Sequence, residues 1–184
     1  MIVQTEHTPN PNTLKFLTGK KVSEIGPVDF SKEDNNIDVP LANAILSLNG
    51  AVMVFFGEDF ITVKKEDKFN WKDLKHSVIS EINDYYSKGN EAVIKKNHKK
   101  HKENKNESND EIVNKIKEIL DSKIRPAVAR DGGDIKFKSF TNGVVKVDLR
   151  GSCSGCPSSL ITLKQGVQNL LCHYIPEVKK VEAD

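Results

Sequence analysis

The stretch that decides the fold of this chain reads VVKVDLRGSCSGCPSS and covers residues 144–159. Its first half alternates between apolar and polar residues, which is typical of a strand with one buried face. Its second half places two cysteines three positions apart, directly before Pro157. Proline suits the first turn of a helix, because the N–H that it lacks would have no partner there. The sequence therefore predicts that Cys153 and Cys156 lie at the junction of a strand and a helix.

The same part of the chain is expected to contain a hairpin, two helices and a last strand. In chain order these are a helix over 112–124, strands over 135–140 and 145–149, a helix over 157–174 and a candidate last strand over 176–181. The pair Asn142-Gly143 between the two alternating runs is a strong hairpin signal. The first helix is expected to end or bend near Pro126, and Asp131-Gly132-Gly133-Asp134 finishes it, since a glycine can take a positive φ.

The first half of the chain predicts a second α+β unit. Its expected elements are a strand over 13–17, a helix opened by Pro40, strands over 51–56 and 60–63, and a helix over 71–86 that stops before Gly89. The short segment Gly57-Glu58-Asp59 between the two later strands indicates a hairpin. No group of residues in this unit has the composition of a catalytic site.

A charged segment separates the two halves. Residues 95–106 contain no apolar side chain and are dominated by one sign of charge, so they cannot bury a core and favour an extended chain. The fold class predicted from sequence is therefore α+β, with two small domains joined by a flexible linker. The expected boundaries are 1–90 for the first domain, 91–108 for the linker and 109–184 for the second domain.

The composition excludes several broad classes. A net charge of +2 gives no support for a nucleic-acid partner. No apolar run approaches the roughly 20 residues that span a bilayer, so no membrane association is expected. Three cysteines, two of them close together, do not make a secreted disulfide framework. A reducing compartment fits better, where such a pair is typical of metal binding or redox chemistry.

The position of the cysteine pair favours thiolates. A helix N-terminus presents unpaired N–H groups and partial positive charge, which stabilise a thiolate relative to a thiol. Gly151 and Gly155 lack side chains, so backbone amides can approach the sulfurs closely. Two intervening residues let both sulfurs point into one small volume, as in iron–sulfur and zinc sites.

The number of ligands in one chain is too small for either kind of site. A [4Fe–4S] cluster usually takes four cysteines, and so does a structural Cys₄ zinc site. Cys172 lies sixteen residues beyond Cys156 on the same expected helix, which corresponds to about 24 Å along the axis. We expect it to be a small core residue. Two copies related by a two-fold axis would supply four thiolates, and their separation would release the cluster, as a carrier requires.

Spacing alone leaves three chemistries open: iron–sulfur, zinc shared across a dimer, and thiol–disulfide exchange. A thioredoxin-like redox pair also occupies a helix N-terminus, but no βαβ unit with a parallel sheet is evident in the pattern. Bridging zinc has the same ligand demand as a bridging cluster. Other polar residues are expected to carry no chemistry, with Asp131 and Asp134 in turn and capping roles.

Three motifs in order give the second half a family resemblance. It resembles the C-terminal domain of NifU-like (Nfu-type) iron–sulfur proteins over about residues 110–184, through Ile124-Arg125-Pro126, Asp131-Gly132-Gly133-Asp134-Ile135 and Gly151-Ser152-Cys153-Ser154-Gly155-Cys156-Pro157-Ser158-Ser159. The first half resembles the N-terminal domain of mitochondrial and related bacterial Nfu proteins, through the segments 8–16 and 55–63, TPNPNTLKF and FFGEDFITV.

This resemblance implies an iron–sulfur carrier that is not an enzyme. It implies a [4Fe–4S] cluster bridged between two subunits, held by Cys153 and Cys156 of each, with homodimer formation on cluster binding. The implied partners are upstream cluster donors and apo iron–sulfur target proteins, and the N-terminal domain is expected to recruit them. The absence of a presequence before the Thr8 motif favours a bacterial cytoplasmic protein, with a processed mitochondrial form as the alternative.

Overall fold

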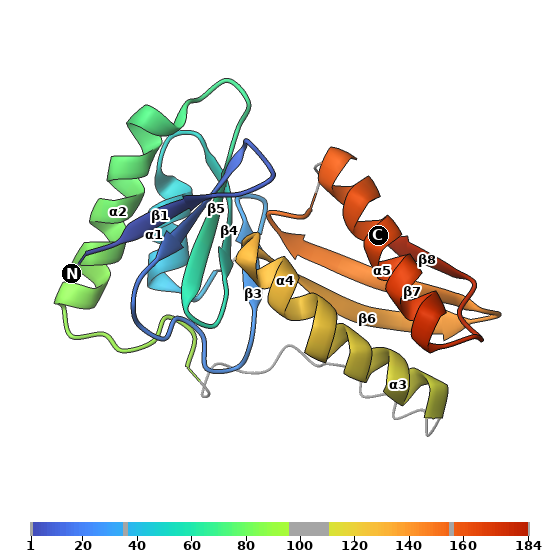
Figure 1. Cartoon of the computed structure of the whole chain (residues 1–184). Helices are drawn as coiled ribbons and strands as arrows, with labels where there is room; N and C mark the ends of the chain where they lie inside the picture. Colours follow the sequence, from blue (N-terminus) through green and yellow to red (C-terminus); the bar gives the residue numbers. More distant parts are fainter. Residues whose placement is uncertain (1, 35–36, 96–110, 155–156, 184) are drawn as a thin grey trace. The chain divides into compact units, whose positions relative to one another are not determined.

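The computed structural model describes residues 2–34, 37–95, 111–154 and 157–183, the last range with side chains from Ile161 onward. The chain divides into two compact units, Met1–Lys99 and Lys100–Asp184. Each unit contains helices and a sheet (Figure 1), which confirms the predicted α+β class. The predicted linker over 91–108 lies largely outside the described residues, so its conformation stays a prediction.

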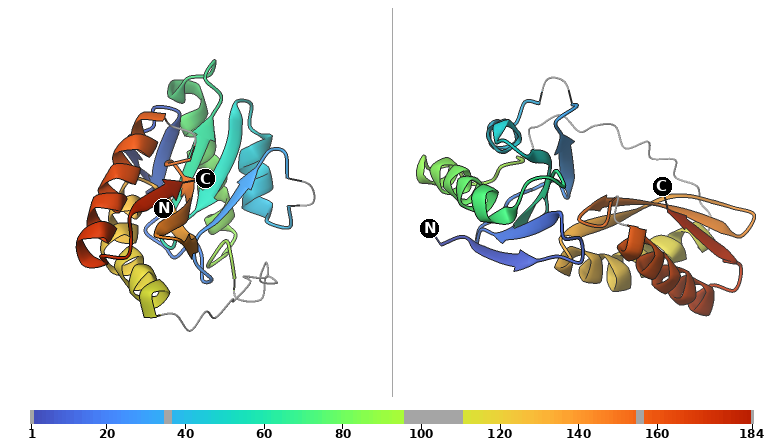
Figure 2. Two further views of the ribbon diagram at one scale, coloured as in Figure 1. Left: turned by 90° about the vertical axis from the view of Figure 1, so that its right-hand side faces the viewer. Right: turned by 90° about the horizontal axis from the view of Figure 1, so that it is seen from above.

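The first unit is built on a five-stranded antiparallel sheet of order β1-β2-β5-β4-β3. Its elements are β1 (Gln4–His7), β2 (Thr13–Leu17), β3 (Val28–Ser31), α1 (Pro40–Ser47), β4 (Ala51–Phe56), β5 (Phe60–Lys65) and α2 (Trp71–Ser87). Both helices cover the same face of the sheet (Figures 1 and 2). The apolar side chains of that face and of the helices form one core, which includes Leu14, Phe16, Val54, Phe56, Ile61, Leu41, Ile45, Val78 and Ile82.

The three central strands and both helices of this unit agree with the sequence prediction. The edge strands β1 and β3 are not predicted, because each has four residues and most of their side chains are exposed or half-buried. A strand with so little buried surface shows no apolar alternation in its sequence. Backbone pairing with β2 and β4 holds these segments in the sheet.

The first unit also extends past residue 90. Ala92, Val93 and Ile94 are 2–3% exposed, and Ile94 belongs to the core of the unit. Their backbone N–H groups help to fix them, since those of Val93 and Ile94 both donate to the Val22 carbonyl, at 2.9 and 3.0 Å. The sequence assigns these residues to the linker because the charged run follows so closely, whereas burial of three apolar side chains draws them into the first unit.

The second unit has a three-stranded sheet of order β6-β7-β8 with helices on one face (Figure 1). Its elements are α3 (Glu111–Ile119), η1 (Leu120–Ile124), α4 (Arg125–Arg130), β6 (Gly133–Thr141), β7 (Val144–Gly151), α5 (Pro157–Tyr174) and β8 (Lys180–Ala183). Alternate residues of the strands meet the helices in one core, which includes Ile116, Leu120, Val128, Ile135, Val147, Leu149, Val167, Leu171 and Val181. No helix among the described residues is long and apolar enough to cross a membrane.

The predicted hairpin forms, and a parallel pair accompanies it. Asn142 and Gly143 have φ values of 52° and 80°, as the predicted Asn-Gly turn requires. β8 then pairs with β7 in the parallel direction after the crossover through α5. The unit β7-α5-β8 is therefore a βαβ unit, and the expectation that none is present is wrong. The fold of this unit thus gives no reason to exclude a thioredoxin-like pair.

Pro126 does not end the first helix of this unit. The five-residue turn η1 is π-helical, and its hydrogen bond runs from the Arg125 N–H to the Leu120 carbonyl. A proline inside a helix removes one backbone donor and crowds the preceding turn. The wider π turn takes up that disturbance, and the helix continues as α4 to Arg130. Arg125 stands at the change of helical pitch.

Truncation of Ile94 tests whether residues 92–94 belong to the first unit. We expect Ile94→Ala to lower the free energy of unfolding of that unit by about 2–4 kcal/mol, because a buried side chain is lost. The chain has one tryptophan, Trp71 on α2, so its fluorescence reports on this unit alone. Lys95→Ala, at the exposed neighbouring position, should change stability by less than about 0.5 kcal/mol. Equal effects of the two substitutions would contradict the assignment.

Candidate thiolate site

Cys153 lies in the turn between β7, which ends at Gly151, and α5, which begins at Pro157. It is 5% exposed, and its side chain belongs to the hydrophobic core of the second unit. The strand-to-helix location agrees with the sequence prediction. Cys156 lies outside the described residues, so its place beside Cys153 stays a prediction.

Ser152 and its neighbours anchor this turn to the segment that precedes β6. The Ser152 backbone N–H donates to the Gly132 carbonyl at 3.2 Å, and its hydroxyl donates to the Asp131 carbonyl. Within the turn, the Ser154 N–H and hydroxyl both donate to the Gly151 carbonyl, at 3.2 and 2.9 Å. Gly132 and Gly151 have φ values of 81° and 70°, in the left-handed region that favours glycine. The cysteine turn is therefore fixed by backbone groups on both of its sides.

Gly133 gives the Cys153 sulfur its space. A Cβ atom at Gly133 would lie 2.9 Å from the Cys153 Sγ and 2.6 Å from the Arg150 carbonyl oxygen. Both separations are shorter than ordinary van der Waals contact, so only glycine fits here. Gly133 is also the register partner of Gly151 in the β6–β7 pair. The Cys153 thiol therefore packs against the backbone of Gly133, at the end of the β6–β7 pair.

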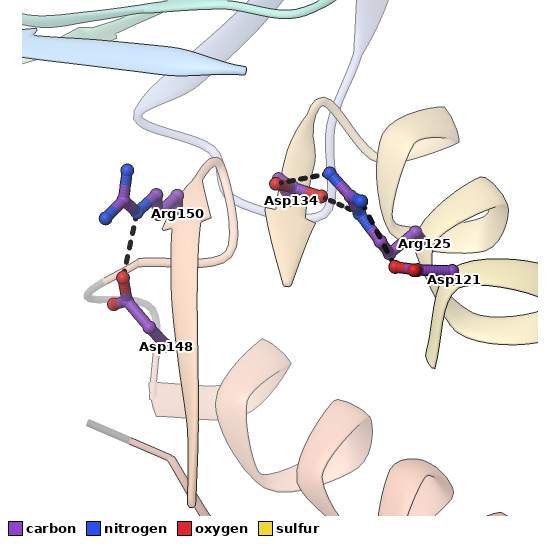
Figure 3. A network of polar contacts seen from close by, with 5 residues as sticks. All are labelled: Asp121, Arg125, Asp134, Asp148 and Arg150. Atoms are coloured by element: carbon purple, nitrogen blue, oxygen red, sulfur yellow. Dashed lines mark hydrogen bonds and ion pairs between the residues drawn. The ribbon is translucent and has the colours of Figure 1, made fainter. Parts of the chain in front are cut away.

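Arg125 and Asp134 form a two-pronged ion pair beside this contact (Figure 3). The Arg125 Nε donates to Asp134 Oδ1 at 2.8 Å, and Nη2 donates to Oδ2 at 3.1 Å. Asp134 is 3% exposed, whereas Asp121, the second partner of Arg125 at 3.1 Å, has a 62% exposed side chain. The hydrogen bonds to Asp134 raise the pKa of Arg125, and burial opposes that rise.

The predicted roles of the two aspartates are corrected in part. Asp131 lies at the end of α4, in the turn where its carbonyl accepts from Ser152, as expected of a turn residue. Asp134 is not a capping residue, since it lies in β6 and pairs with Arg125. The sequence contains one signal for this pair, an arginine nine positions upstream of a carboxylate that begins a buried strand. Such a carboxylate needs a cation when it leaves water.

A second ion pair lies across the sheet from Asp134. The Arg150 Nε donates to the Asp148 carboxylate at 2.8 Å (Figure 3), and both residues are on β7. Arg150 is the register partner of Asp134. Side chains of directly opposite residues share a face of the sheet, so this face carries charge while Ile135 and Leu149 supply the apolar face.

The three sequence motifs therefore meet at one place. Arg125 of the first motif binds Asp134 of the second, the Asp131 and Gly132 carbonyls of the second hold Ser152 of the third, and Gly133 contacts Cys153. Motifs separated by up to about thirty positions thus form one framework around the Cys153 thiol.

Cys172 has a separate role. It is half-buried and packs against the core of the second unit, in line with the structural role predicted for it. Among the residues that the structure describes, no three His, Cys, Asp or Glu side chains are grouped closely enough to hold a metal ion. Cys156, the second ligand that the sequence predicts, lies outside the described ranges.

Comparison with known families assigns both halves of the chain. Residues 3–89 match the family model described as "Scaffold protein Nfu/NifU N terminal", and residues 116–182 match the "NifU-like domain". The human "NFU1 iron-sulfur cluster scaffold homolog, mitochondrial" is 46% identical over 183 residues, which cover 99% of this chain and 71% of that protein. The chain belongs to the Nfu family of NifU-like scaffold proteins.

Other relatives agree with this membership. The Arabidopsis thaliana "NifU-like protein 4, mitochondrial" is 44% identical over 187 residues, covering 100% of this chain and 66% of that protein. The chain thus spans about two thirds of the length of these Nfu relatives. A solution structure of a NifU-like protein from Saccharomyces cerevisiae is 27% identical, covers 52% of this chain and 86% of its own, and has a TM-score of 0.48. The family assignment rests on the sequence matches alone.

The relatives contradict the predicted localisation. The human and Arabidopsis thaliana relatives are named as mitochondrial proteins, which points to mitochondria and not to a bacterial cytoplasm. The prediction is wrong because it rests on the residues at which the sequence begins. These relatives are longer than the matched region, so the first residues of this sequence carry no information about targeting.

Two glycines of the second unit provide a matched test of the packing at the Cys153 thiol. We expect Gly133→Ala to destabilise the unit by about 1–3 kcal/mol, because the added methyl group would push the Arg150 carbonyl and the Cys153 sulfur away from residue 133. Gly166→Ala, on α5 with open space around its Cβ direction, should be neutral or stabilising by up to about 1 kcal/mol. Thermal unfolding of both variants measures the difference. A Gly133→Ala protein as stable as the parent would contradict the close packing at Cys153.

Proposed function

We propose that this chain is an iron–sulfur cluster scaffold that holds one [4Fe–4S] cluster between two copies and transfers it to apo target proteins. Cys153 and Cys156 of each copy supply the four thiolate ligands. The observation that carries this proposal is that the three second-unit motifs contact one another around the turn that contains Cys153. The printed names of the relatives, which describe an iron–sulfur cluster scaffold, support the choice of cargo.

Ligand number supports the sharing between copies. A [4Fe–4S] cluster usually takes four cysteines, and this chain has three. Cys172 is placed fifteen residues into α5 and packs against the core, so it is a poor candidate for a third ligand. A two-fold axis doubles the remaining pair and completes the set. The cluster is then lost when the copies separate, because two thiolates per chain cannot retain it.

The surroundings of Cys153 suit a thiolate that has to bind a cluster and later release it. Contacts of Ser152 and Gly133 hold the backbone of the cysteine turn in place, so only the Cys153 side chain has to move when cargo arrives. Cys153 is 5% exposed in the free chain, and its sulfur therefore has to turn toward solvent in order to meet a second copy. The return of the side chain to the apolar core then favours the empty state, which assists release.

Transfer to a recipient is an exchange of ligands. Each iron–thiolate bond to Cys153 or Cys156 breaks as a bond to a cysteine of the recipient forms, so the irons and sulfides keep their oxidation states. We propose that the chain is a carrier in this exchange and not an enzyme. The first unit has its own core and, among its described residues, no group of three His, Cys, Asp or Glu side chains that could hold a metal ion. We propose that it recruits cluster donors and apo recipients.

Serine substitution of each cysteine tests this function. After anaerobic incubation with ferrous iron and sulfide, we expect the parent protein to bind about two irons per chain, which is four irons shared by two chains. Cys153→Ser and Cys156→Ser should each remove nearly all of the bound iron, because one thiolate per chain remains. Cys172→Ser is the matched control and should bind as much iron as the parent. Iron, sulfide and visible absorbance are measured together.

Three results would contradict the proposal. Full iron binding by Cys153→Ser would remove the cysteine pair from the site. A colourless parent protein, with stoichiometric zinc that iron and sulfide do not displace, would make it a zinc-bridged module instead. A monomer whose cysteines cycle against a dithiol would indicate the thiol–disulfide chemistry that spacing alone leaves open.

A further inference from the structure

The fully exposed residues of α5 carry no formal charge, and the lysine of this helix, Lys164, is half-buried at the border of that set. Its exposed residues, with side chains described from Ile161 onward, are Ile161, Thr162, Gln165, Gly166, Asn169, His173 and Tyr174. At 100° per residue, all of these except Tyr174 fall within one arc of the helix surface. We call these six residues, from Ile161 to His173, the α5 outer face. The Gln165 amide donates to the Asn169 side chain within it, at 3.3 Å.

The helices α2 and α3 have charged exposed sides, whereas the short α1 exposes Pro40, Asn43 and Ser47, which are uncharged. The exposed residues of α3 include Glu111, Lys115, Lys117 and Glu118, and those of α2 include Lys72, Asp73 and Asp84. Asp, Glu, Lys and Arg make up 29% of the whole chain. A helix side without them is therefore a local departure in composition. Depletion of charged residues is the compositional feature that marks the centre of protein interfaces.

Ile161 places an apolar side chain at the end of this face nearest the cysteine pair. It is 70% exposed, although it lies four residues after Pro157, the first residue of α5. Four residues of helix correspond to about 6 Å along the axis. The apolar end of the face is thus the end that adjoins Cys156 in the chain.

We propose that the α5 outer face is the surface on which a second copy of this chain packs when the two copies share a cluster. The inference rests on the proposed function, because the shared cargo brings the two cysteine turns together. Since α5 begins directly after Cys156, the first turn of the helix in one copy then faces the first turn in the other.

Two-fold symmetry explains the missing charges. In an isologous interface, a residue near the axis meets its own counterpart from the other copy. A lysine or glutamate there would face a like charge, which opposes association. Ile161, by contrast, meets Ile161 of the second copy, and both apolar side chains leave water. Two copies of the α5 outer face can therefore pack against each other without charge repulsion. A recipient with a charged docking surface would find no opposite charge on this face.

The size of the face explains why association would depend on the cargo. Six residues per copy is well below the roughly 20–30 residues per side of a stable protein–protein interface. We therefore expect the face alone to leave the empty chain monomeric. Together with four thiolate bonds it stabilises the loaded dimer, and it no longer holds the copies once the cluster has left.

Opposite charges at position 161 test the proposal. We expect Ile161→Glu and Ile161→Lys each to raise the dissociation constant of the iron- and sulfide-loaded dimer at least about tenfold, because like charges meet across the axis. An equimolar mixture of the two variants should recover most of the loss, since glutamate then meets lysine. Sedimentation velocity under anaerobic conditions, with iron counted in each fraction, measures both. Ile2→Glu, at an 85% exposed isoleucine of the first unit, is the matched control and should behave as the parent.

The outcomes separate this inference from the proposed function. If the parent chain binds iron as a dimer and Ile161→Glu does so with unchanged affinity, the inference is wrong while the proposed function stands. The same holds if Ile161→Glu impairs only delivery to a recipient, or if the mixed variants show no recovery. If the parent itself binds no iron, the proposed function fails first. Melting curves of the empty variants, expected to match the parent, verify that the exposed substitution leaves the fold intact.

Discussion

At Gly133 the backbone of β6 approaches the Arg150 carbonyl of β7 and the Cys153 sulfur, because no Cβ atom intervenes. The second unit is arranged around this contact. It lets the β6–β7 pair close up to its last residues, Gly133 and Gly151. It also brings Ser152 within hydrogen-bonding distance of the turn that ends α4. A side chain at this point would separate the strands and the thiol together, so fold and site share one constraint.

The Arg125–Asp134 pair holds the other side of the same region. The π turn η1 absorbs Pro126 and leaves Arg125 where its guanidinium can bind the buried carboxylate with two hydrogen bonds. Removal of Arg125 would leave the buried Asp134 carboxylate without its cation, which is the costly way to break such a pair, whereas Arg125 has a second partner in Asp121. Helix packing, strand pairing and the conformation of the thiol turn therefore depend on one another. The proposed cargo would be bound at the turn where all three meet.

Much of this arrangement can be predicted from sequence, because its signals are local. The Asn142-Gly143 turn, the helix opened by Pro157 and the strand before Cys153 depend on neighbouring residues, and all three are present. Long-range features cannot be predicted in the same way. The parallel pairing of β8 with β7 depends on how α5 crosses the sheet, and no residue of β8 encodes it alone. The partner of Asp134 lies in another element, and Ala92–Ile94 are buried by distant residues of the first unit.

For the candidate site, cysteine spacing and the predicted start of the helix indicate where the thiols lie. The contact at Gly133 and the hydrogen bonds of Ser152 cannot be predicted in this way, because they join atoms that only the fold brings together. The lack of charge among the exposed residues of α5 is not predicted for another reason. Helical periodicity indicates which residues are buried and says little about the exposed ones.

Native mass spectrometry of the anaerobically loaded protein tests most directly whether two copies share one cluster. We expect one dominant species with the mass of two 20.6 kDa chains plus a single cluster of four irons and four sulfides. The same sample treated with an iron chelator should give the mass of one chain. A loaded species that contains a single chain, or a dimer that carries one complete cluster in each copy, would contradict the sharing of ligands between copies.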